Sequence, residues 1–361
     1  MKVLRLLLAG LLAIALAGCA AEPSGTTGSP AQSPQTPAGG QGLKVCQVAD
    51  ASGFADGSFN QTVHNGLLRA ADELGVATGE IQAPGEADYA AAVESLVDAD
   101  CELIILVGFK HADAAQAAAQ ANPEVDFLLV DAMVETPLDN LKPLLFDPAG
   151  AAFLAGYLAA AQSRTGAVAT FGAVKNADVL LFLNGYAGGV AHFNQTKDAD
   201  VQLLGWDVET QDGQFITSQA PFQDVAAGKT TAENLAGQGA DVIFPVAGMA
   251  GTGALQVAQE SGGEVQAIWV DSDGCLANPS FCPVILTSVV KAMDVAVFDA
   301  ISAAVDGQFS NEPYHGTLAN GGVGLSPFHE LDDQVSAQTR AELEQIREQL
   351  IDGSITPPAA G

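Results

Sequence analysis

The sequence predicts an α/β protein made of two doubly wound lobes, each built on a parallel sheet. The chain has 361 residues, a length typical of two domains. Short runs rich in Val, Ile and Leu alternate with Ala-rich stretches of helical spacing, which is typical of strands followed by crossover helices. The strand runs are apolar along their whole length, which indicates burial on both faces of the sheet.

The elements follow in order from residue 44. Strands are predicted at 44–50, 102–108, 126–132, 142–147, 167–173, 201–208, 241–248, 265–271 and 284–290. Helices are predicted at 59–74, 86–98, 111–121, 149–163, 223–237, 250–261 and 291–306. These strands are too many for one small sheet, so we divide them between two lobes.

The N-terminus resembles a bacterial lipoprotein leader. Lys2 and Arg5 precede an apolar run that is too short for a comfortable membrane span. The run closes on Leu-Ala-Gly-Cys, which resembles a lipobox, so we expect a signal peptide at 1–18. The resemblance implies that Cys19 is acylated, with a palmitate among its lipids, and anchors the protein on the extracytoplasmic face of the cell membrane. The alternative is a plain secretory leader that contains a cysteine.

Residues 19–43 are rich in Pro, Ser, Thr, Gly and Gln. Such a composition buries no core and predicts a flexible tether. The net charge of the whole chain is −30. A phosphate backbone or an anionic lipid surface would be repelled by that charge, so nucleic acid is excluded as a partner.

Four cysteines follow Cys19, and an even number in an exported protein suggests two disulfides. Four cysteines allow three pairings. We favour Cys275 with Cys282, because the loop between them is short and contains proline. Cys46 and Cys101 begin two apolar runs that could be neighbouring strands, so we pair them. No cysteine or histidine spacing suggests a metal site, and we expect neither a metal nor a cofactor.

Polar groups follow the strands where ligands bind in parallel sheets. Asp50, Asp131 and Asp271 each come at or after the end of a different strand, Phe109 follows a fourth strand, and Ala-Gly-Met-Ala-Gly-Thr-Gly follows a fifth. Carboxylates accept hydrogen bonds from hydroxyl and N–H groups. The pattern therefore suits a small neutral, polyol-like ligand better than an anion.

Several segments carry a family likeness. The segment 50–61, DASGFADGSFNQ, resembles the opening motif of the BMP (basic membrane protein) family, the PnrA-like purine nucleoside-binding lipoproteins of ABC transporters. Other segments agree: PAGAAFLAGYLAA (148–160), GADVIFPVAGMAGTG (239–253), VDSD (270–273), LTSVVK (286–291) and LANGGVGLSP (318–327). The likeness covers about 44–356. Ser52 departs from the glycine usual in the motif, and we interpret it as stiffening the turn.

The resemblance implies a type I periplasmic-binding-protein fold, in which two lobes joined by three crossings hold ligand in a cleft. We expect the N-terminal lobe at 44–147 plus 273–312. We expect the C-terminal lobe at 148–272 plus 313–356, followed by a tail at 357–361.

The resemblance also implies ligand-binding roles. Phe59 would stack on one face of a purine and Phe222 on the other, with Tyr186 as the competing aromatic. Asn60 and Asp50 would bond the base edge. Asp131, Asp271 and Lys291 would hold the ribose hydroxyls. Gly248 would let the backbone approach the sugar.

Plainer interpretations of the same residues stay open. Phe59 could belong to the core, and Ser58 or Asp56 could cap the helix that follows. Asp131 and Asp271 could simply end their strands. A lysine at the start of a helix is unfavourable for the helix dipole, so Lys291 suggests a specific partner such as Asp271.

The function expected from these features is a lipid-anchored substrate-binding protein of an ABC importer. It would bind a nucleoside, with a purine favoured, close on it, and deliver it to the permease and ATPase. The alternative is an extracytoplasmic binding or sensing lipoprotein for a sugar or a signalling molecule. We do not expect an enzyme: the glycines at 248–253 form only a partial dinucleotide motif, and the acids Asp271 and Asp273 stand only two residues apart.

Overall fold

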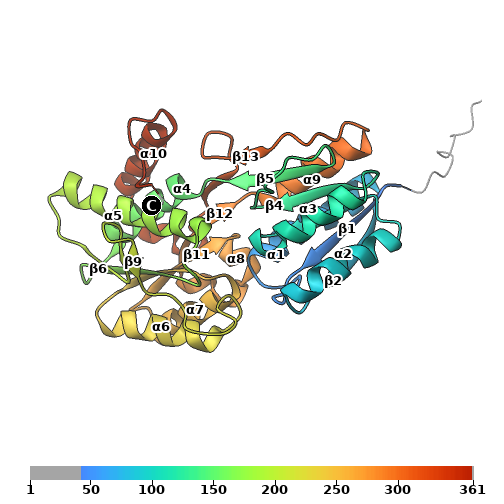
Figure 1. Cartoon of the computed structure of the whole chain (residues 1–361). Helices are drawn as coiled ribbons and strands as arrows, with labels where there is room; N and C mark the ends of the chain where they lie inside the picture. Colours follow the sequence, from blue (N-terminus) through green and yellow to red (C-terminus); the bar gives the residue numbers. More distant parts are fainter. Residues whose placement is uncertain (1–41, 360–361) are drawn as a thin grey trace, which may run out of the picture. The chain divides into compact units, whose positions relative to one another are not determined.

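The computed structural model describes residues 42–359 (Figure 1). The predicted signal peptide, Cys19 and the tether up to residue 41 lie outside these residues, so the lipoprotein predictions stay predictions. Within the described part, no helix combines the length and the apolar character needed to cross a bilayer.

The first lobe is built on a six-stranded sheet in the order β13-β5-β4-β3-β1-β2, with every pair parallel. Its strands are β1 (Lys44–Ala49), β2 (Ala77–Gln82), β3 (Leu103–Val107), β4 (Asp126–Val130), β5 (Leu141–Phe146) and β13 (Tyr314–Gly316). Its helices are α1 (Phe59–Leu74), η1 (Glu86–Asp88), α2 (Tyr89–Asp98), η2 (Phe109–His111), α3 (Ala112–Ala121) and α9 (Met293–Val305).

The second lobe repeats this plan with the order β14-β12-β11-β10-β6-β7, and only β14 runs antiparallel to its neighbour. Its strands are β6 (Ala167–Gly172), β7 (Gln202–Leu204), β10 (Val242–Val246), β11 (Gln266–Asp271), β12 (Ile285–Lys291) and β14 (Val323–Leu325). A small ribbon adds β8 (Trp206–Asp207) and β9 (Asp212–Gly213). Its helices are α4 (Ala149–Gln162), α5 (Ala177–Lys197), α6 (Val225–Gly237), η3 (Gly248–Gly251), α7 (Thr252–Glu260), α8 (Gly274–Ala277), η4 (Pro279–Val284), η5 (His329–Gln334) and α10 (Ala337–Ile351).

Helices cover both faces of each sheet, as the doubly wound prediction requires. In the first lobe α1 and α9 pack on one face, while α2 and α3 pack on the other. In the second lobe α4 and α5 cover one face, while α6 and α7 cover the other. Burying apolar side chains on both faces explains why these strands are hydrophobic throughout.

The chain passes between the lobes three times: from β5 to α4, from β12 to α9, and from β13 to β14. Two expected lobe boundaries differ from this path. Strand β12 pairs with β11 from Ala267–Ile285 to Asp271–Val290, so the chain stays in the second lobe through Lys291 rather than leaving it at residue 273. Strand β13 pairs with β5, so the last crossing follows Gly316 rather than residue 312. An apolar run does not reveal which sheet it joins.

Helix α5 is absent from the sequence prediction because its segment Asn-Gly-Tyr-Ala-Gly-Gly looks unfavourable for a helix. The glycines serve the packing of α5 against α4. A Cβ on Gly189 would lie 1.9 Å from the Phe153 carbonyl oxygen, and one on Gly185 would lie 2.3 Å from that of Ala149. Only glycine lets the two backbones approach this closely. The glycines that make this segment look unfavourable for a helix are therefore the residues that allow α5 to pack against α4.

Other missed elements are short, polar or at an edge. Strand β2 is mostly exposed at the edge of its sheet, and β13 and β14 have three residues each. Helix α10 is mostly polar, and its capping residue Ser336 accepts a hydrogen bond from the Thr339 backbone N–H.

Both favoured disulfides are present. Cys46 of β1 is bonded to Cys101, which lies just before β3. Because β1 and β3 are neighbours in the first sheet, this bond joins adjacent strands. Cys275 is bonded to Cys282.

Candidate functional site

A cleft lies at the carboxyl ends of the strands of both lobes. All eight residues expected to bind ligand line it: Asp50, Phe59, Asn60, Asp131, Phe222, Gly248, Asp271 and Lys291. The space between the lining atoms is about 830 Å³, a volume that includes the open mouth of the cleft. Their convergence from distant parts of the chain makes this cleft the candidate binding site.

The start of α1 is organised by the buried carboxylate of Asp56. It accepts hydrogen bonds from the backbone N–H groups of Ser58, Asn60 and Gln61 at 3.0 Å each. Ser58 occupies the N-cap position, but its side chain makes no capping bond. Instead its hydroxyl donates to the Val270 carbonyl of the other lobe at 3.2 Å. Asp56, rather than Ser58, therefore satisfies the first turn.

Asn60 is oriented by the same network. Its Nδ2 donates to Asp50 Oδ1 and to Asp56 Oδ2, both at 3.0 Å. Its Oδ1 is buried and has no partner among residues 42–359. A buried acceptor without a partner is unfavourable, and this one belongs to a residue that lines the cleft.

Phe59 and Phe222 bring aromatic rings to the cleft from different lobes. Gly108 has φ of +91°, and a Cβ there would lie 3.2 Å from the Phe59 ring. In the second lobe, on the other side of the cleft, a Cβ on Gly248 would lie 3.7 Å from Phe222 Cδ1. The competing aromatic, Tyr186, is fully buried against Phe244 and is not among the lining residues. The geometry therefore favours Phe222.

Lys291 places an ammonium group between acids of both lobes. Its Nζ lies 2.5 Å from Asp131 Oδ2 and 3.5 Å from Asp271 Oδ1. It also lies 4.8 Å from the centroid of the Phe182 ring, within cation–π range. The partner expected for Lys291 was Asp271, and the structure adds Asp131 as the closer one. Lys291 ends β12 rather than starting α9, which removes the expected conflict with a helix dipole.

The pKa values of these groups respond to burial and to each other. Burial opposes the charge of Lys291, but the carboxylates of Asp131 and Asp271 outweigh it and raise its pKa. Burial raises the pKa of Asp271, although Lys291 counteracts it. Burial, reinforced by Asp131, raises the pKa of Asp178 to about 6. The buried Lys291 ammonium thus interacts with the carboxylates of both lobes at once.

Residues outside the sequence prediction also line the cleft. Asn176, Asp178 and Phe182 come from the start of α5, and Tyr89 and His111 come from the first lobe. Because α5 was not predicted, no pattern placed its first turn at the cleft. The histidines show no metal-ligand spacing in the sequence, so no pattern distinguished His111 from the others.

Hydrogen bonds join the lobes around the cleft. Gln223 Nε2 of the second lobe donates to Ser52 Oγ of the first at 2.8 Å. The Gly57 carbonyl accepts bonds from Trp269 Nε1, Ser272 Oγ and Asn278 Nδ2 at 3.0, 2.9 and 3.2 Å. Ser52, which departs from the family motif, therefore contacts the opposite lobe in addition to shaping its own turn.

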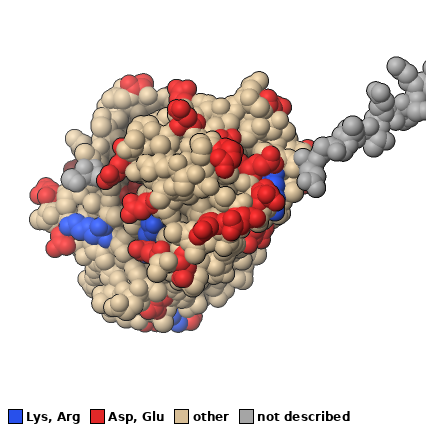
Figure 2. Space-filling model, turned by 45° about the vertical axis from the view of Figure 1, so that its right-hand side comes forward, with Lys and Arg blue, Asp and Glu red and all other residues tan. Residues whose placement is uncertain are grey.

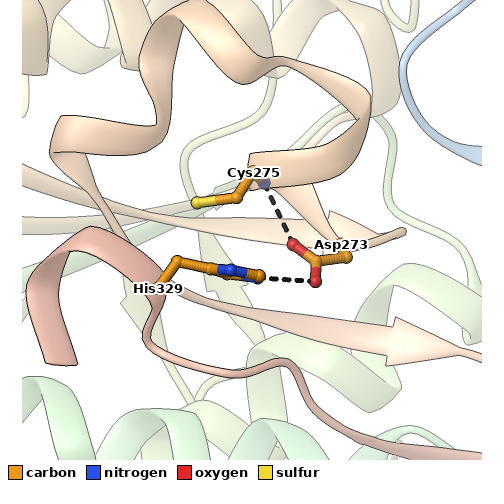
Figure 3. Close-up of side chains that lie close together, drawn as sticks. All are labelled: Asp273, Cys275 and His329. Carbon is orange, nitrogen blue, oxygen red and sulfur yellow. Dashed lines mark hydrogen bonds and ion pairs between the residues drawn. The ribbon is translucent and has the colours of Figure 1, made fainter.

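A separate group of side chains brings Asp273, Cys275 and His329 within 4.8 Å of one another (Figure 3). The sulfur of Cys275 is bonded to Cys282, so it offers no thiolate. The Asp273 carboxylate accepts from the Cys275 backbone N–H at 3.0 Å and lies 2.7 Å from His329 Nε2. This group is a structural contact between α8 and η5. Since Asp273 is engaged here while Asp271 faces the cleft, the two acids do not form one site.

Fold and cleft together define a two-lobe α/β binding protein. Over residues 43–359 the chain matches the Bmp family, described as "ABC transporter substrate-binding protein PnrA-like", and it belongs to this family. The family consists of substrate-binding proteins of ABC transporters rather than enzymes, and they work on the extracytoplasmic side.

Named relatives are similar along most of the chain. The "ABC transporter nucleoside-binding protein BmpA" of Lactococcus lactis is 28% identical over 95% of this chain and 95% of its own length. "Basic membrane protein A" of Borreliella burgdorferi is 27% identical over 88% of each chain.

Solved structures confirm the fold. An ABC transporter solute-binding protein from Aeropyrum pernix superposes with a TM-score of 0.76 at 27% identity, covering 87% of this chain and 92% of its own. A solute-binding protein from Conexibacter woesei gives 0.69 at 18% identity, covering 88% and 98%, which supports the fold alone.

Proposed function

We propose that this protein is the lipid-anchored receptor of an ABC importer and binds a nucleoside, with a purine favoured, between its lobes. The observation that carries the proposal is the meeting of eight expected residues from both lobes in one cleft. The printed name of the Lactococcus lactis relative, a nucleoside-binding protein, supports the same ligand class.

The base would lie between Phe59 and Phe222. A purine is flat and polarizable, and each base stacked on an aromatic ring contributes about 1–3 kcal/mol. Asp50 and Asn60 stand beside Phe59 at the carboxyl end of β1 and the start of α1. Their oxygen atoms would accept hydrogen bonds from N–H groups on the base edge.

The ribose would contact Asp131, Asp271 and Lys291. The Oδ1 atom of Asp271 is buried, and within the described chain it accepts no hydrogen bond, although the Lys291 ammonium lies 3.5 Å away. A ribose hydroxyl would donate a hydrogen bond to this acceptor, whereas a ligand lacking the hydroxyl would leave it without one at a cost of about 1–3 kcal/mol. Gly248, with φ of +54°, has no side chain to keep the sugar away from the backbone.

The charge of the cleft favours a neutral ligand. Five carboxylates line it (Asp50, Asp56, Asp131, Asp178 and Asp271), against the ammonium groups of Lys110 and Lys291. Lys291 is already paired with two acids, and Lys110 is paired with Glu86 at 2.9 Å. Acidic groups also dominate the face seen in Figure 2. A nucleotide phosphate would find no free cation among the lining residues, so nucleosides fit better than nucleotides.

Binding would couple to movement of the lobes. A ligand that touches both lobes stabilises the closed state, because half of its contacts are missing when the lobes separate. The closed receptor would then deliver the nucleoside to the permease and its ATPase.

A thermal-shift screen of the purified protein tests the ligand class. It should include nucleosides, free bases, nucleotides, pentoses, hexoses and amino acids. A ligand at 100 times its dissociation constant stabilises by about 2.7 kcal/mol. We expect a clear shift with purine nucleosides. A shift with a hexose instead would favour the alternative, a sugar-binding or sensing receptor, and would overturn the nucleoside proposal.

The lipid anchor has its own test, because Cys19 lies outside the described residues. Changing Cys19 to Ser should move the protein from the membrane fraction to the soluble fraction. Continued membrane attachment of the Cys19→Ser protein would contradict acylation at this position.

A further inference from the structure

His111 lies at the buried end of the cleft in the first lobe. It occupies the last position of η2, directly after β3, and is fully buried. Its ring stacks on Tyr89 with centroids 3.8 Å apart and planes 20° apart. His111 lines the cleft together with Asp50 and Asn60, the two residues proposed to contact the base.

The hydrogen bonding of His111 determines which of its nitrogen atoms carries the proton. Nδ1 lies 2.8 Å from the Val107 carbonyl oxygen. A carbonyl oxygen only accepts, so Nδ1 must donate. Burial lowers the pKa of His111 to about 4, although the Val107 carbonyl opposes this shift, so the ring is neutral near pH 7. Nε2 is therefore an unprotonated acceptor, and it is buried with no partner within residues 42–359.

The neighbouring groups of this end of the cleft are acceptors too. Asn60 cannot turn its amide around, because Nδ2 donates to the carboxylates of Asp50 and Asp56. A flipped amide would place its oxygen against two negative charges. Asn60 Oδ1 is therefore a second acceptor that lacks a partner in the described part of the chain. The Asp50 carboxylate is a third group that accepts only.

We propose that His111 is a specificity-determining residue that, with Asn60 and Asp50, selects bases that carry a proton on N1, namely guanine and hypoxanthine, over adenine. This inference rests on the proposed nucleoside function. Guanine presents N1–H beside its 2-amino group, and hypoxanthine presents N1–H. Adenine presents a bare N1 lone pair at the same place and donates only from its 6-amino group. A lone pair set against these acceptors would leave both sides unpaired.

The Tyr89 hydroxyl, which also belongs to a residue lining the cleft, can donate a hydrogen bond to the O6 atom of guanine. Burial, helped by Asp50 and Glu86, raises the pKa of the Tyr89 hydroxyl to about 12. This hydroxyl keeps its proton at physiological pH and can donate to the O6 atom. Adenine carries an amino group at that position, which would compete as a donor.

Titration calorimetry of guanosine, inosine, adenosine and 1-methylguanosine on the full chain tests this proposal. We expect guanosine to bind at least about tenfold more tightly than adenosine. We expect 1-methylguanosine to lose a similar factor, because the methyl group replaces the N1 proton. If nucleosides bind but adenosine equals or exceeds guanosine, the specificity inference is overturned and the nucleoside function stands. If no nucleoside binds, both are overturned.

The His111→Phe variant keeps a ring on Tyr89 and removes the acceptor. Guanosine should weaken by about tenfold while adenosine stays within about twofold, so the preference collapses. The matched control is His64→Phe on α1, whose imidazole pairs with Glu80 outside the cleft, and it should leave the preference intact. An unchanged guanosine-to-adenosine ratio in a folded His111→Phe protein would refute the role of His111. If that variant does not fold, the ranking of the four nucleosides on the unmodified protein still decides.

Discussion

Lys291 of the second lobe and Asp131 of the first form a buried ion pair across the cleft, with Nζ 2.5 Å from Oδ2. Only 4% of the Lys291 side chain and 10% of the Asp131 side chain are exposed. Removing two charges from water is unfavourable unless each is well paired. The pair therefore favours the arrangement in which both lobes meet. It also holds in place two of the side chains that are proposed to bind the ribose.

Replacing Lys291 by Met should destabilise the protein by about 3–5 kcal/mol, because Asp131 and Asp271 would remain buried without a cation. Urea unfolding measures this loss. Lys229→Met is the matched control: its ammonium pairs with Glu260 at 2.7 Å on a more exposed surface, and its loss should be below about 1 kcal/mol. Equal losses in the two variants would show that the buried ion pair stabilises the protein no more than the surface pair does.

Phe59→Ala should weaken purine nucleoside binding by about 1–3 kcal/mol, because one face of the base loses its stacking partner. Calorimetry on the folded variant gives the value. Phe298→Ala provides the comparison, since that ring on α9 lies under the Arg69 guanidinium at 3.7 Å and is outside the cleft lining. Full affinity in folded Phe59→Ala would mean that Phe59 is a core residue, the plainer interpretation of the sequence.

Ser52→Gly should speed ligand release by about two- to tenfold, the effect of one hydrogen bond, since it removes the acceptor of Gln223 Nε2 across the lobes. Stopped-flow displacement measures the dissociation rate, and the association rate should change little. Ser52→Thr keeps the hydroxyl and should behave as the parent. Gln223→Ala should reproduce the effect of Ser52→Gly, and the two changes together should add nothing. Additive effects would contradict an interaction between these side chains.

Asp178→Asn should raise the free energy of unfolding at pH 7.5 and have little effect near pH 3.5. Burial and Asp131 raise the pKa of Asp178 from 3.8 to about 6 in the folded protein. Between these values the folded state binds the proton more tightly than the unfolded chain, so stability decreases as the pH rises through this interval. Denaturant unfolding at both pH values, compared with Asp139→Asn on an exposed loop, isolates the effect. A larger gain at pH 3.5 than at pH 7.5 would reverse the sign and refute this account.

The strands and helices with strong apolar patterns were predictable. Helix α1 spans Phe59–Leu74, as predicted, because its apolar positions recur with helical spacing and it ends at Gly75. Helix α5 was not predictable from local preference, since its glycines are justified only by contact with α4. Strand β12 was predicted as a strand but assigned to the wrong lobe, because pairing partners are set by non-local contacts.

By itself the sequence determined the α/β class and the two-lobe plan. It favoured the disulfide pairs that the structure contains, and through the family likeness it predicted the residues that meet in the cleft. Hydrophobic periodicity and strand-end chemistry are local properties, and the motif shared with the family places them along the chain. The tertiary structure alone decided that Lys291 pairs with Asp131 of the other lobe, that Ser52 reaches Gln223, and that His111 presents an unprotonated Nε2. Each of these depends on which distant segments come together in the folded protein. A polar group that is buried there has only the neighbours that the fold supplies, so the fold also determines which groups lack a hydrogen-bond partner.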